Sequence, residues 1–232
     1  MWLCGATRLR SLPAVRSSNL KALKMAIEVP SPEHSTMLPG EQPGCIVYTF
    51  GIKDDSVFEQ ELFEQNPNCH FYGYDGSTDQ FGASLSGAAA EKSPVRTHFS
   101  KADVTATSNS RSEPPAYTIQ DLMALNGHDH IDVLRLDVGG EEFESFRTVM
   151  DFFLNNKKEV PVAQLLVKVH LLPTKISTQG LIEWWEMLEE SGFRPYAAQP
   201  DLLMPLYEGT NHQVVASTYS FMNIKDSRSP FL

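Results

Sequence analysis

The sequence predicts a doubly wound α/β domain with a mostly parallel sheet, and three observations support this prediction. Segments typical of strands alternate with segments typical of helices from residue 45 to residue 193. The strand segments are apolar on both faces, as in parallel sheets that helices cover on each side. The last two strand segments follow each other without a clear helix between them, which indicates an antiparallel pair that closes the sheet.

The first half of the chain supplies three strands. Short apolar runs with β-branched and aromatic residues predict them at residues 45–50, 69–74 and 95–99. Residues 54–56 can cap a helix, which Asn66-Pro67-Asn68 ends. Residues 78–94 indicate a loop or a weak helix, and residues 104–116 indicate a loop.

The second half shows a clearer pattern. Further strands are expected at residues 131–138, 162–172, 193–197 and 214–222. Thr118 and Asp121 have the spacing of a capping box, which predicts a helix start. The apolar residues of the next helix trace one helical face at Phe143, Phe146, Val149, Met150, Phe153 and Leu154. In the last helix, residues 179–190, one of Trp184 and Trp185 is expected in the core and the other partly at the surface, with an aromatic acceptor platform as the alternative.

The folded domain is expected to span residues 45–232. Residues 1–27 hold five of the 19 Lys and Arg residues and none of the 29 Asp and Glu residues. This composition indicates a disordered tail, or an upstream start with Met25 as the working initiator, and it also resembles a mitochondrial presequence. Residues 28–44 are rich in Pro and Gly and indicate a linker. We expect a cytoplasmic protein, with mitochondrial import as the alternative.

Composition excludes several classes of protein. No stretch approaches the roughly 20 apolar residues that a membrane-spanning helix needs. The net charge of −10 would repel phosphate backbones, which argues against general nucleic-acid binding. Three cysteines make neither a disulfide framework nor a zinc site, and Cys45 and Cys69 are expected to be buried thiols.

The chemistry of such a fold is expected beyond the carboxyl ends of the strands. Asp75 ends the second strand, 24 residues after Gly51, which is the spacing of the ribose-binding acid in nucleotide-binding α/β folds. A turn Asp before glycine is the alternative interpretation. Because the chain lacks both the G-x-G-x-x-G and the P-loop patterns, a nucleoside without phosphate fits better than NAD, and S-adenosylmethionine is the leading candidate.

Two segments carry a family resemblance. Cys45–Ser77 and Tyr117–Phe146 resemble the FkbM-type methyltransferase domain, closest to the animal methyltransferase-like proteins of that group. The more specific segment contains Thr-Ile-x-Asp-Leu, then Ile-Asp-Val-Leu-x-Leu-Asp, then Gly and Glu before an amphipathic helix. The similarity covers about residues 45–222, and it implies a Rossmann-like class I methyltransferase fold that uses S-adenosylmethionine.

The resemblance also implies roles for individual residues. Gly51 would lie under the methionine part of the donor, Asp75 would hold the ribose with Ser77 beside it, and Asp103 would face the adenine edge. Asp137 would lie close to the methyl group and the acceptor. His170 follows a buried strand and is either a general base or a structural histidine.

The chain departs from the family pattern at two positions. Thr49 stands where the family places a carboxylate two residues before the motif glycine. Gly139 stands where the family has the glutamate of Asp-x-Glu-Gly, although Glu141 and Glu142 follow closely.

These departures leave more than one function open. The first hypothesis is O-methylation of a small or sugar-like acceptor, and the second is a binding or scaffold protein that keeps the fold without turnover. A nucleotide-dependent oxidoreductase is a third interpretation. His128-Asp129-His130 lacks a third ligand at a recognised distance, so no metal site is expected there.

Overall fold

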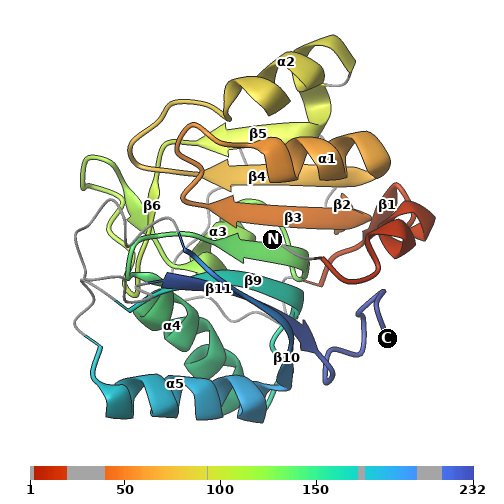
Figure 1. Cartoon of the computed structure of the whole chain (residues 1–232). Coiled ribbons are helices and arrows are strands. Elements are labelled where there is room, and N and C mark those ends of the chain that lie inside the picture. Colours follow the sequence, from red (N-terminus) through yellow and green to blue (C-terminus); the bar gives the residue numbers. More distant parts are fainter. Residues whose placement is uncertain (1–2, 20–39, 93, 172–175, 203–215) are drawn as a thin grey trace.

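The computed structural model describes residues 3–19, 40–92, 94–171, 176–202 and 216–232 (Figure 1). Its main feature is a seven-stranded sheet in the order β10-β11-β9-β8-β3-β4-β5. The strands are β3 (Cys45–Phe50), β4 (Cys69–Tyr74), β5 (Thr97–Ser100), β8 (Ile131–Leu136), β9 (Val162–His170), β10 (Phe193–Pro200) and β11 (Ala216–Asn223). β3 pairs in parallel with β4 and β8, whereas β11 is antiparallel to both β9 and β10. The predicted fold class and its antiparallel closing pair are therefore confirmed.

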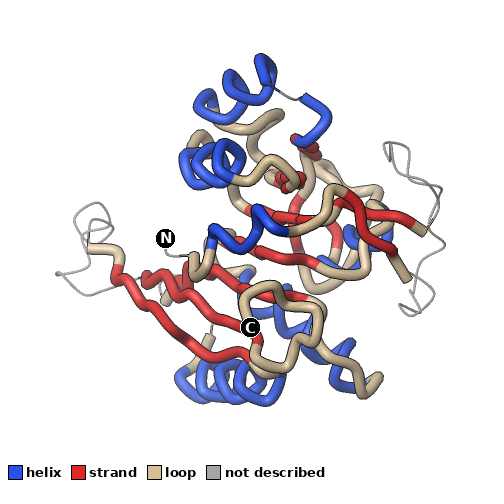
Figure 2. Tube along the Cα trace, turned by 90° about the vertical axis from the view of Figure 1, so that its right-hand side faces the viewer, coloured by secondary structure: helices blue, strands red, loops and turns tan. Residues whose placement is uncertain are grey.

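Helices cover both faces of this sheet (Figures 1 and 2). They are α1 (Val57–Gln65), α2 (Ala83–Lys92), α3 (Ile119–Leu125), α4 (Glu142–Asn155) and α5 (Thr178–Ser191). Apolar residues of α1 and α2 pack with Cys45 and Val47 of β3, whereas α3, α4 and α5 pack with Ile46, Tyr48 and Phe50. Successive residues of β3 thus enter two different cores, which explains why the strand is buried at every position.

The helix ends follow the predicted chemistry with one exception. The Thr118 side chain accepts a hydrogen bond from the Asp121 backbone N–H and begins α3 as expected. Ser56 precedes α1, but its side chain makes no cap there and instead accepts a hydrogen bond from Gly82 N at 2.9 Å. Asp55 serves at the start of α1 instead, because its Oδ1 accepts a hydrogen bond from Val57 N at 3.0 Å.

The expectation of a disordered tail is wrong for residues 3–19. A 3-10 helix (Ala6–Ser11) leads into β1 (Val15–Ser17), which pairs antiparallel with β2 (Glu41–Pro43). Leu9 is fully buried against Phe231, and Figure 2 shows the first helix beside the C-terminal segment. The basic composition of this segment did not indicate that it packs on the domain, because a single residue, Leu9, supplies most of its buried surface. Residues 20–39, which include Met25 and most of the predicted linker, lie outside the described part of the chain.

The two buried cysteines are bonded rather than free. Cys45 and Cys69 form a disulfide, with a Cα–Cα distance of 4.3 Å. They begin the adjacent parallel strands β3 and β4 and are direct register partners. Their separation of 24 residues gave no pairing signal, because only the strand register brings them together.

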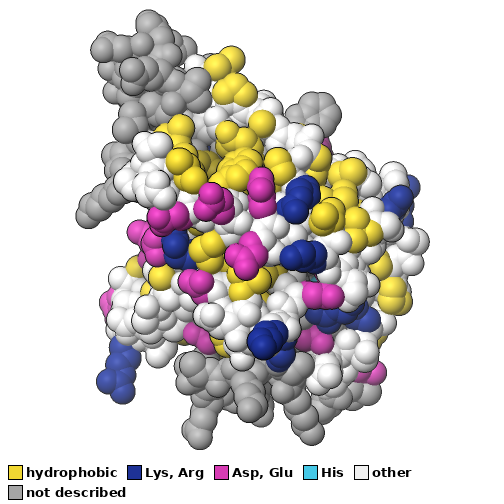
Figure 3. Space-filling model, turned by 90° about the horizontal axis from the view of Figure 1, so that it is seen from below, with side chains coloured by type: hydrophobic (Ala, Val, Ile, Leu, Met, Phe, Trp, Pro, Cys, Tyr) yellow, Lys and Arg dark blue, Asp and Glu magenta, His cyan; other side chains and the backbone are white. Residues whose placement is uncertain are grey.

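One further segment differs from the expected loop, and another follows the helix alternative expected for residues 78–94. Residues 104–116 are bordered by a short parallel pair, β6 (Asp103–Val104) and β7 (Ala116–Tyr117), and residues 83–92 form α2. Trp184 is fully buried and Trp185 only partly, as predicted. Among the described helices, none combines the length and apolar character that crossing a bilayer requires. On the face seen in Figure 3, acidic and basic side chains of the described residues are interspersed.

Candidate functional site

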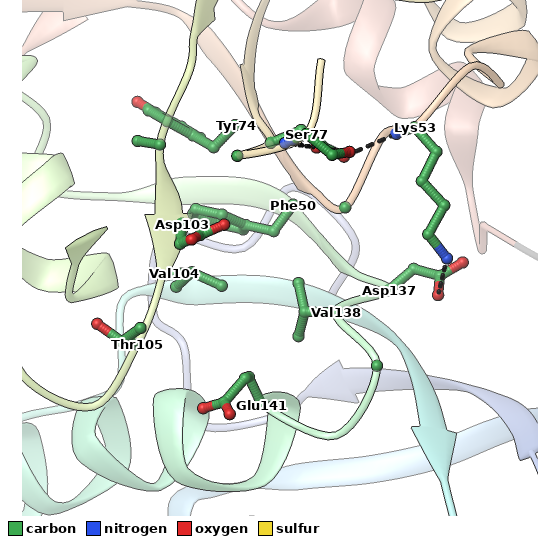
Figure 4. A pocket seen from close by; sticks show the side chains of 15 residues that line it. Phe50, Lys53, Tyr74, Ser77, Asp103, Val104, Thr105, Asp137, Val138 and Glu141 are labelled. Carbon is green, nitrogen blue, oxygen red and sulfur yellow. Dashed lines mark hydrogen bonds and ion pairs between the residues drawn. The ribbon is translucent and has the colours of Figure 1, made fainter. Parts of the chain in front are cut away.

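A cavity of about 440 Å³ opens at the carboxyl ends of β3, β4 and β8 (Figure 4). Its acidic lining residues are Asp75, Asp103, Asp137 and Glu141, and its basic one is Lys53. The apolar part of the lining consists of Phe50, Tyr74, Ala102, Val104 and Val138. The volume lies within the roughly 300–1,000 Å³ of typical small-molecule sites. The cavity therefore combines an apolar slot with a strongly acidic rim.

Glycine is required at the base of this cavity. Gly51 has φ +75°, and a Cβ added there would lie 1.9 Å from the backbone oxygen of Asp137. The loop after β3 therefore passes directly against the end of β8. A Cβ at Gly76 would likewise lie 2.2 Å from Asp103 Oδ1. At Gly51 the obstacle is backbone and φ is positive, so only glycine fits there without a shift of the chain.

Asp75 is held by the loops on either side of it. Its Oδ2 accepts a hydrogen bond from Lys53 N at 2.8 Å, and its Oδ1 accepts hydrogen bonds from Ser77 N and Ser77 Oγ at 2.7 and 2.6 Å. Burial alone would raise the pKa of the Asp75 carboxyl, but these hydrogen bonds outweigh it and hold the pKa below its usual value. Asp75 is thus the predicted turn residue, and its carboxylate also lines the cavity.

Asp137 lies on the opposite wall with weaker contacts. Figure 4 shows Lys53 Nζ directed toward it, at 3.9 Å from Oδ1. Arg135 Nη2 lies 3.9 Å from Oδ2, and His170 Nε2 lies 3.5 Å from Oδ1. Oδ1 is buried, yet it has no hydrogen-bond partner among the described residues. A buried carboxylate oxygen without a donor is costly unless a ligand supplies one.

Glu142 is a functional candidate that the sequence did not single out. It begins α4 and is fully buried. Its Oε1 accepts a hydrogen bond from His170 N at 2.7 Å and lies 3.2 Å from His170 Nδ1, while its Oε2 accepts one from Gly140 N at 2.7 Å. Glu142 therefore fixes both the His170 ring and the loop after β8. Its position in the first turn of a helix gave no signal, because acids are common there.

A second unexpected carboxylate lies next to Thr49. The Thr49 hydroxyl donates to Glu59 Oε1 at 3.0 Å, and Arg135 Nη1 donates to the same oxygen at 3.2 Å. Glu59 belongs to α1, is fully buried, and keeps its Oε2 without a hydrogen-bond partner among the described residues. The Thr49 side chain thus contacts a carboxylate that α1 supplies, although Glu59 is not among the described residues that line the cavity.

The structure gathers most of the predicted site residues in one cavity. Gly51, Asp75, Ser77, Asp103 and Asp137 all line it, and His170 lies behind Asp137 rather than in the lining.

The predicted absence of a metal at His128-Asp129-His130 concerns a different part of the molecule. His128 Nδ1 lies 2.8 Å from the Tyr48 hydroxyl, and His130 Nε2 lies 2.7 Å from Asp226. No group of three or more His, Cys, Asp or Glu residues able to hold a metal ion occurs in the described ranges.

Comparison with known proteins gives one family match. Residues 2–205 match a family model described as a methyltransferase domain. No curated protein matches the chain. The similar solved structures include a protein from Clostridium thermocellum titled as an rRNA methylase, with 10% identity, a TM-score of 0.47 and coverage of 80% of this chain and 90% of that chain. Another, the O-MT segment of StiE, has 13% identity, a TM-score of 0.45 and coverage of 79% and 69%.

Proposed function

The chain belongs to the family of methyltransferase domains, and from this premise we propose that it uses S-adenosylmethionine to methylate an oxygen atom of a small or sugar-like acceptor. The observation that supports the donor is the charge of the cavity at the ends of β3, β4 and β8. Four carboxylates and one ammonium line it. S-adenosylmethionine carries a sulfonium and an ammonium against one carboxylate, so this field attracts it and repels nucleotides that carry phosphates.

The lining residues suit the parts of the donor. The apolar slot of Phe50, Tyr74 and Val104 can take the adenine ring, with Asp103 at its polar edge. Asp75 and Ser77 can accept hydrogen bonds from the ribose hydroxyls, because a carboxylate oxygen has more than one lone pair. Gly51 lines the same cavity and would lie against the methionine part. Bound there, S-adenosylmethionine would supply an electrophilic methyl group.

Asp137 and His170 are the residues proposed to handle the proton of the acceptor hydroxyl. Asp137 Oδ1 has no hydrogen-bond partner among the described residues, so it can accept one from that hydroxyl. His170 Nε2, at 3.5 Å, is the next group along the proton's path. Glu142 is a positioning residue, since it holds the Nδ1 side of the His170 ring. Methyl transfer requires this alignment more than it requires covalent catalysis.

A second candidate function is donor binding without turnover. It is favoured by Gly139, which removes a carboxylate expected in the loop after β8 and which has φ +64°. Against it, Glu141 lines the cavity two residues after Gly139, so this loop still brings a carboxylate to the cavity. Localisation in the cytoplasm or the mitochondrion stays a prediction from composition alone.

Calorimetric titration followed by a transfer assay tests both functions. We expect S-adenosylmethionine to bind the full chain and NAD not to bind, and we expect labelled methyl groups to reach an acceptor in a cell extract. Binding without transfer would select the second candidate. If S-adenosylmethionine does not bind while the thermal melt shows a folded protein, both candidates are wrong.

A further inference from the structure

A second cavity, of about 560 Å³, shares Asp137 with the first. We propose that this cavity, the acceptor groove, binds the molecule to be methylated and that this molecule is uncharged and carries several hydroxyl groups. This inference rests on the proposed function. The groove is lined by Asp55, Val57, Phe58, Glu61, Arg135, Asp137, Lys168, Gln199, Pro200, Asp201, Leu202 and Thr218. Of the described lining residues, Asp137 alone is common to the two cavities.

The floor of the acceptor groove is a row of polar side chains across three strands. Lys168 on β9 is the register partner of Thr218 on β11, and Thr218 is the partner of Gln199 on β10. Register partners on neighbouring strands point to the same face, about 4.8 Å apart. The row therefore offers an ammonium, a hydroxyl and an amide at regular intervals, and α1 supplies Phe58 and Glu61 from the side.

Two polar atoms of the lining residues are left without partners. Arg135 has a side chain that is 10% exposed, and its Nε has no hydrogen-bond partner among the described residues. The same holds for Asp137 Oδ1. One atom is a donor and the other an acceptor. A hydroxyl can both accept from a donor and donate to an acceptor, whereas a carboxylate only accepts and an ammonium only donates.

The charges of the acceptor groove argue against an anionic acceptor. Its two cations already have carboxylate partners, because Lys168 Nζ lies 2.9 Å from Asp201 and Arg135 Nη1 lies 3.2 Å from Glu59. The lining also contains Asp55, Glu61 and Asp137. An anion would therefore meet more negative than uncompensated positive charge. A molecule with neutral hydroxyls along the Lys168–Thr218–Gln199 row avoids that repulsion.

The shared residue Asp137 explains how the two cavities would work together. A hydroxyl in the acceptor groove that donates to Asp137 lies at the border of the donor cavity. In the transfer, the hydroxyl oxygen forms a bond to the methyl carbon, the carbon–sulfur bond breaks with its electron pair going to sulfur, and the proton passes to Asp137 or His170. No further reactant is needed for this step.

The test uses matched acceptors and the full chain. Tritiated methyl transfer from S-adenosylmethionine is measured with neutral sugars and inositols and with their uronate and amino-sugar counterparts. We expect neutral members to be labelled at least tenfold faster than either charged series. Faster labelling of a charged series would overturn the inference, and so would no labelling of any member while S-adenosylmethionine binds.

Variants locate the site independently of the acceptor panel. Thr218→Val with Gln199→Leu removes two hydrogen-bonding groups of the floor, so transfer at low acceptor concentration should fall about tenfold through KM. The affinity for S-adenosylmethionine should stay unchanged, and Thr148→Val, on the exposed face of α4, is the matched control. Unchanged transfer in the double variant would remove the acceptor groove from the reaction. Failure of S-adenosylmethionine to bind the native chain would instead contradict the proposed function.

Discussion

The two ends of β8 each carry an aspartate, and the two carboxylates differ in how fully they are hydrogen-bonded. Asp132 at the amino end is fully buried, and its two oxygens accept hydrogen bonds from Arg16 at 3.0 and 2.8 Å and from Ile46 N at 2.8 Å. Among the described residues, the charged groups near the Asp137 carboxylate, at the carboxyl end, lie 3.5 Å or more from it. The same residue type thus stabilises the fold at one end and is left available at the other.

The other residues at the two ends of the strand show the same contrast. At the amino end, Arg228 donates to Asp129, His130 meets Asp226, and the docked residues 3–19 cover the strand starts. At the carboxyl end lie glycines with positive φ and the donor cavity. Substitutions at the amino end should therefore change stability, and substitutions at the carboxyl end should change activity.

Asp137→Asn should give the largest effect on activity. Loss of a positioned proton acceptor costs about 10²–10⁴-fold in rate, while the melting temperature should change little because the carboxylate makes no short hydrogen bond. Single-turnover transfer and a thermal melt measure the two quantities. A variant that keeps its full rate would show that Asp137 does not handle the proton.

Asp132→Asn is the same chemical change at the other end of the strand. It weakens a buried ion pair with Arg16, so we expect a loss of about 3 kcal/mol in the free energy of unfolding. For a chain of this size that lowers the melting temperature by roughly 6–12 °C. The affinity for S-adenosylmethionine below the melt should match the native protein. An unaltered melt would mean that the amino end does not stabilise the fold.

Asp75→Ala tests a carboxylate that both stabilises the turn after β4 and lines the donor cavity. The loss of charge-assisted hydrogen bonds, worth about 1.5–3 kcal/mol each, should weaken S-adenosylmethionine binding tenfold or more, as calorimetry can measure. Thr78→Val, next to Ser77 on the exposed loop, is a control. Full affinity in the Asp75 variant would leave Asp75 with the turn role alone.

The same residue predicts a pH dependence of stability. Folding lowers the pKa of Asp75, so its stabilising effect is present above the unfolded value of about 3.9 and is lost as the pH falls through the folded value. The difference in unfolding free energy between native protein and Asp75→Ala should therefore shrink below about pH 4. Chemical denaturation at several pH values measures it, and a difference independent of pH would contradict this account.

Gly139→Ala should have the smallest effect. Gly139 has φ +64° but open space around a Cβ, so alanine should cost only about 1–2 kcal/mol of backbone strain. Gly51→Ala is the matched variant, because its Cβ would also collide with the Asp137 backbone. We expect S-adenosylmethionine affinity to drop much further at Gly51 than at Gly139. Equal effects at both positions would mean that the close approach at Gly51 does not shape the cavity.

The sequence predicted the sheet well because its signals are local. Runs rich in apolar residues identify β3, β8 and β9, and the Thr118 cap identifies the start of α3. Residues that directly follow a strand, such as Asp75 and Asp137, were also found, since parallel strands end at one edge.

Contacts between distant segments could not be predicted in this way. Glu59 and Glu142 reach Thr49 and His170 from helices, and nothing in their immediate neighbours distinguishes them from solvated acids. Leu9 was missed for a similar reason, because its burial depends on Phe231, more than two hundred residues away. The acceptor groove needs register pairs across three strands, and no single segment carries that information.

The Cys45–Cys69 disulfide makes the stability of the protein depend on the redox state of its surroundings. Closing a loop of 24 residues constrains the unfolded chain by roughly 3 kcal/mol. Disulfides form and persist in oxidising compartments, whereas glutathione keeps thiols reduced in the cytosol. We therefore expect the oxidised and the reduced protein to differ in stability, and thermal melts with and without reductant measure that difference. In a reducing compartment, such as the cytoplasm expected from composition, the protein would be in the less stable, reduced form.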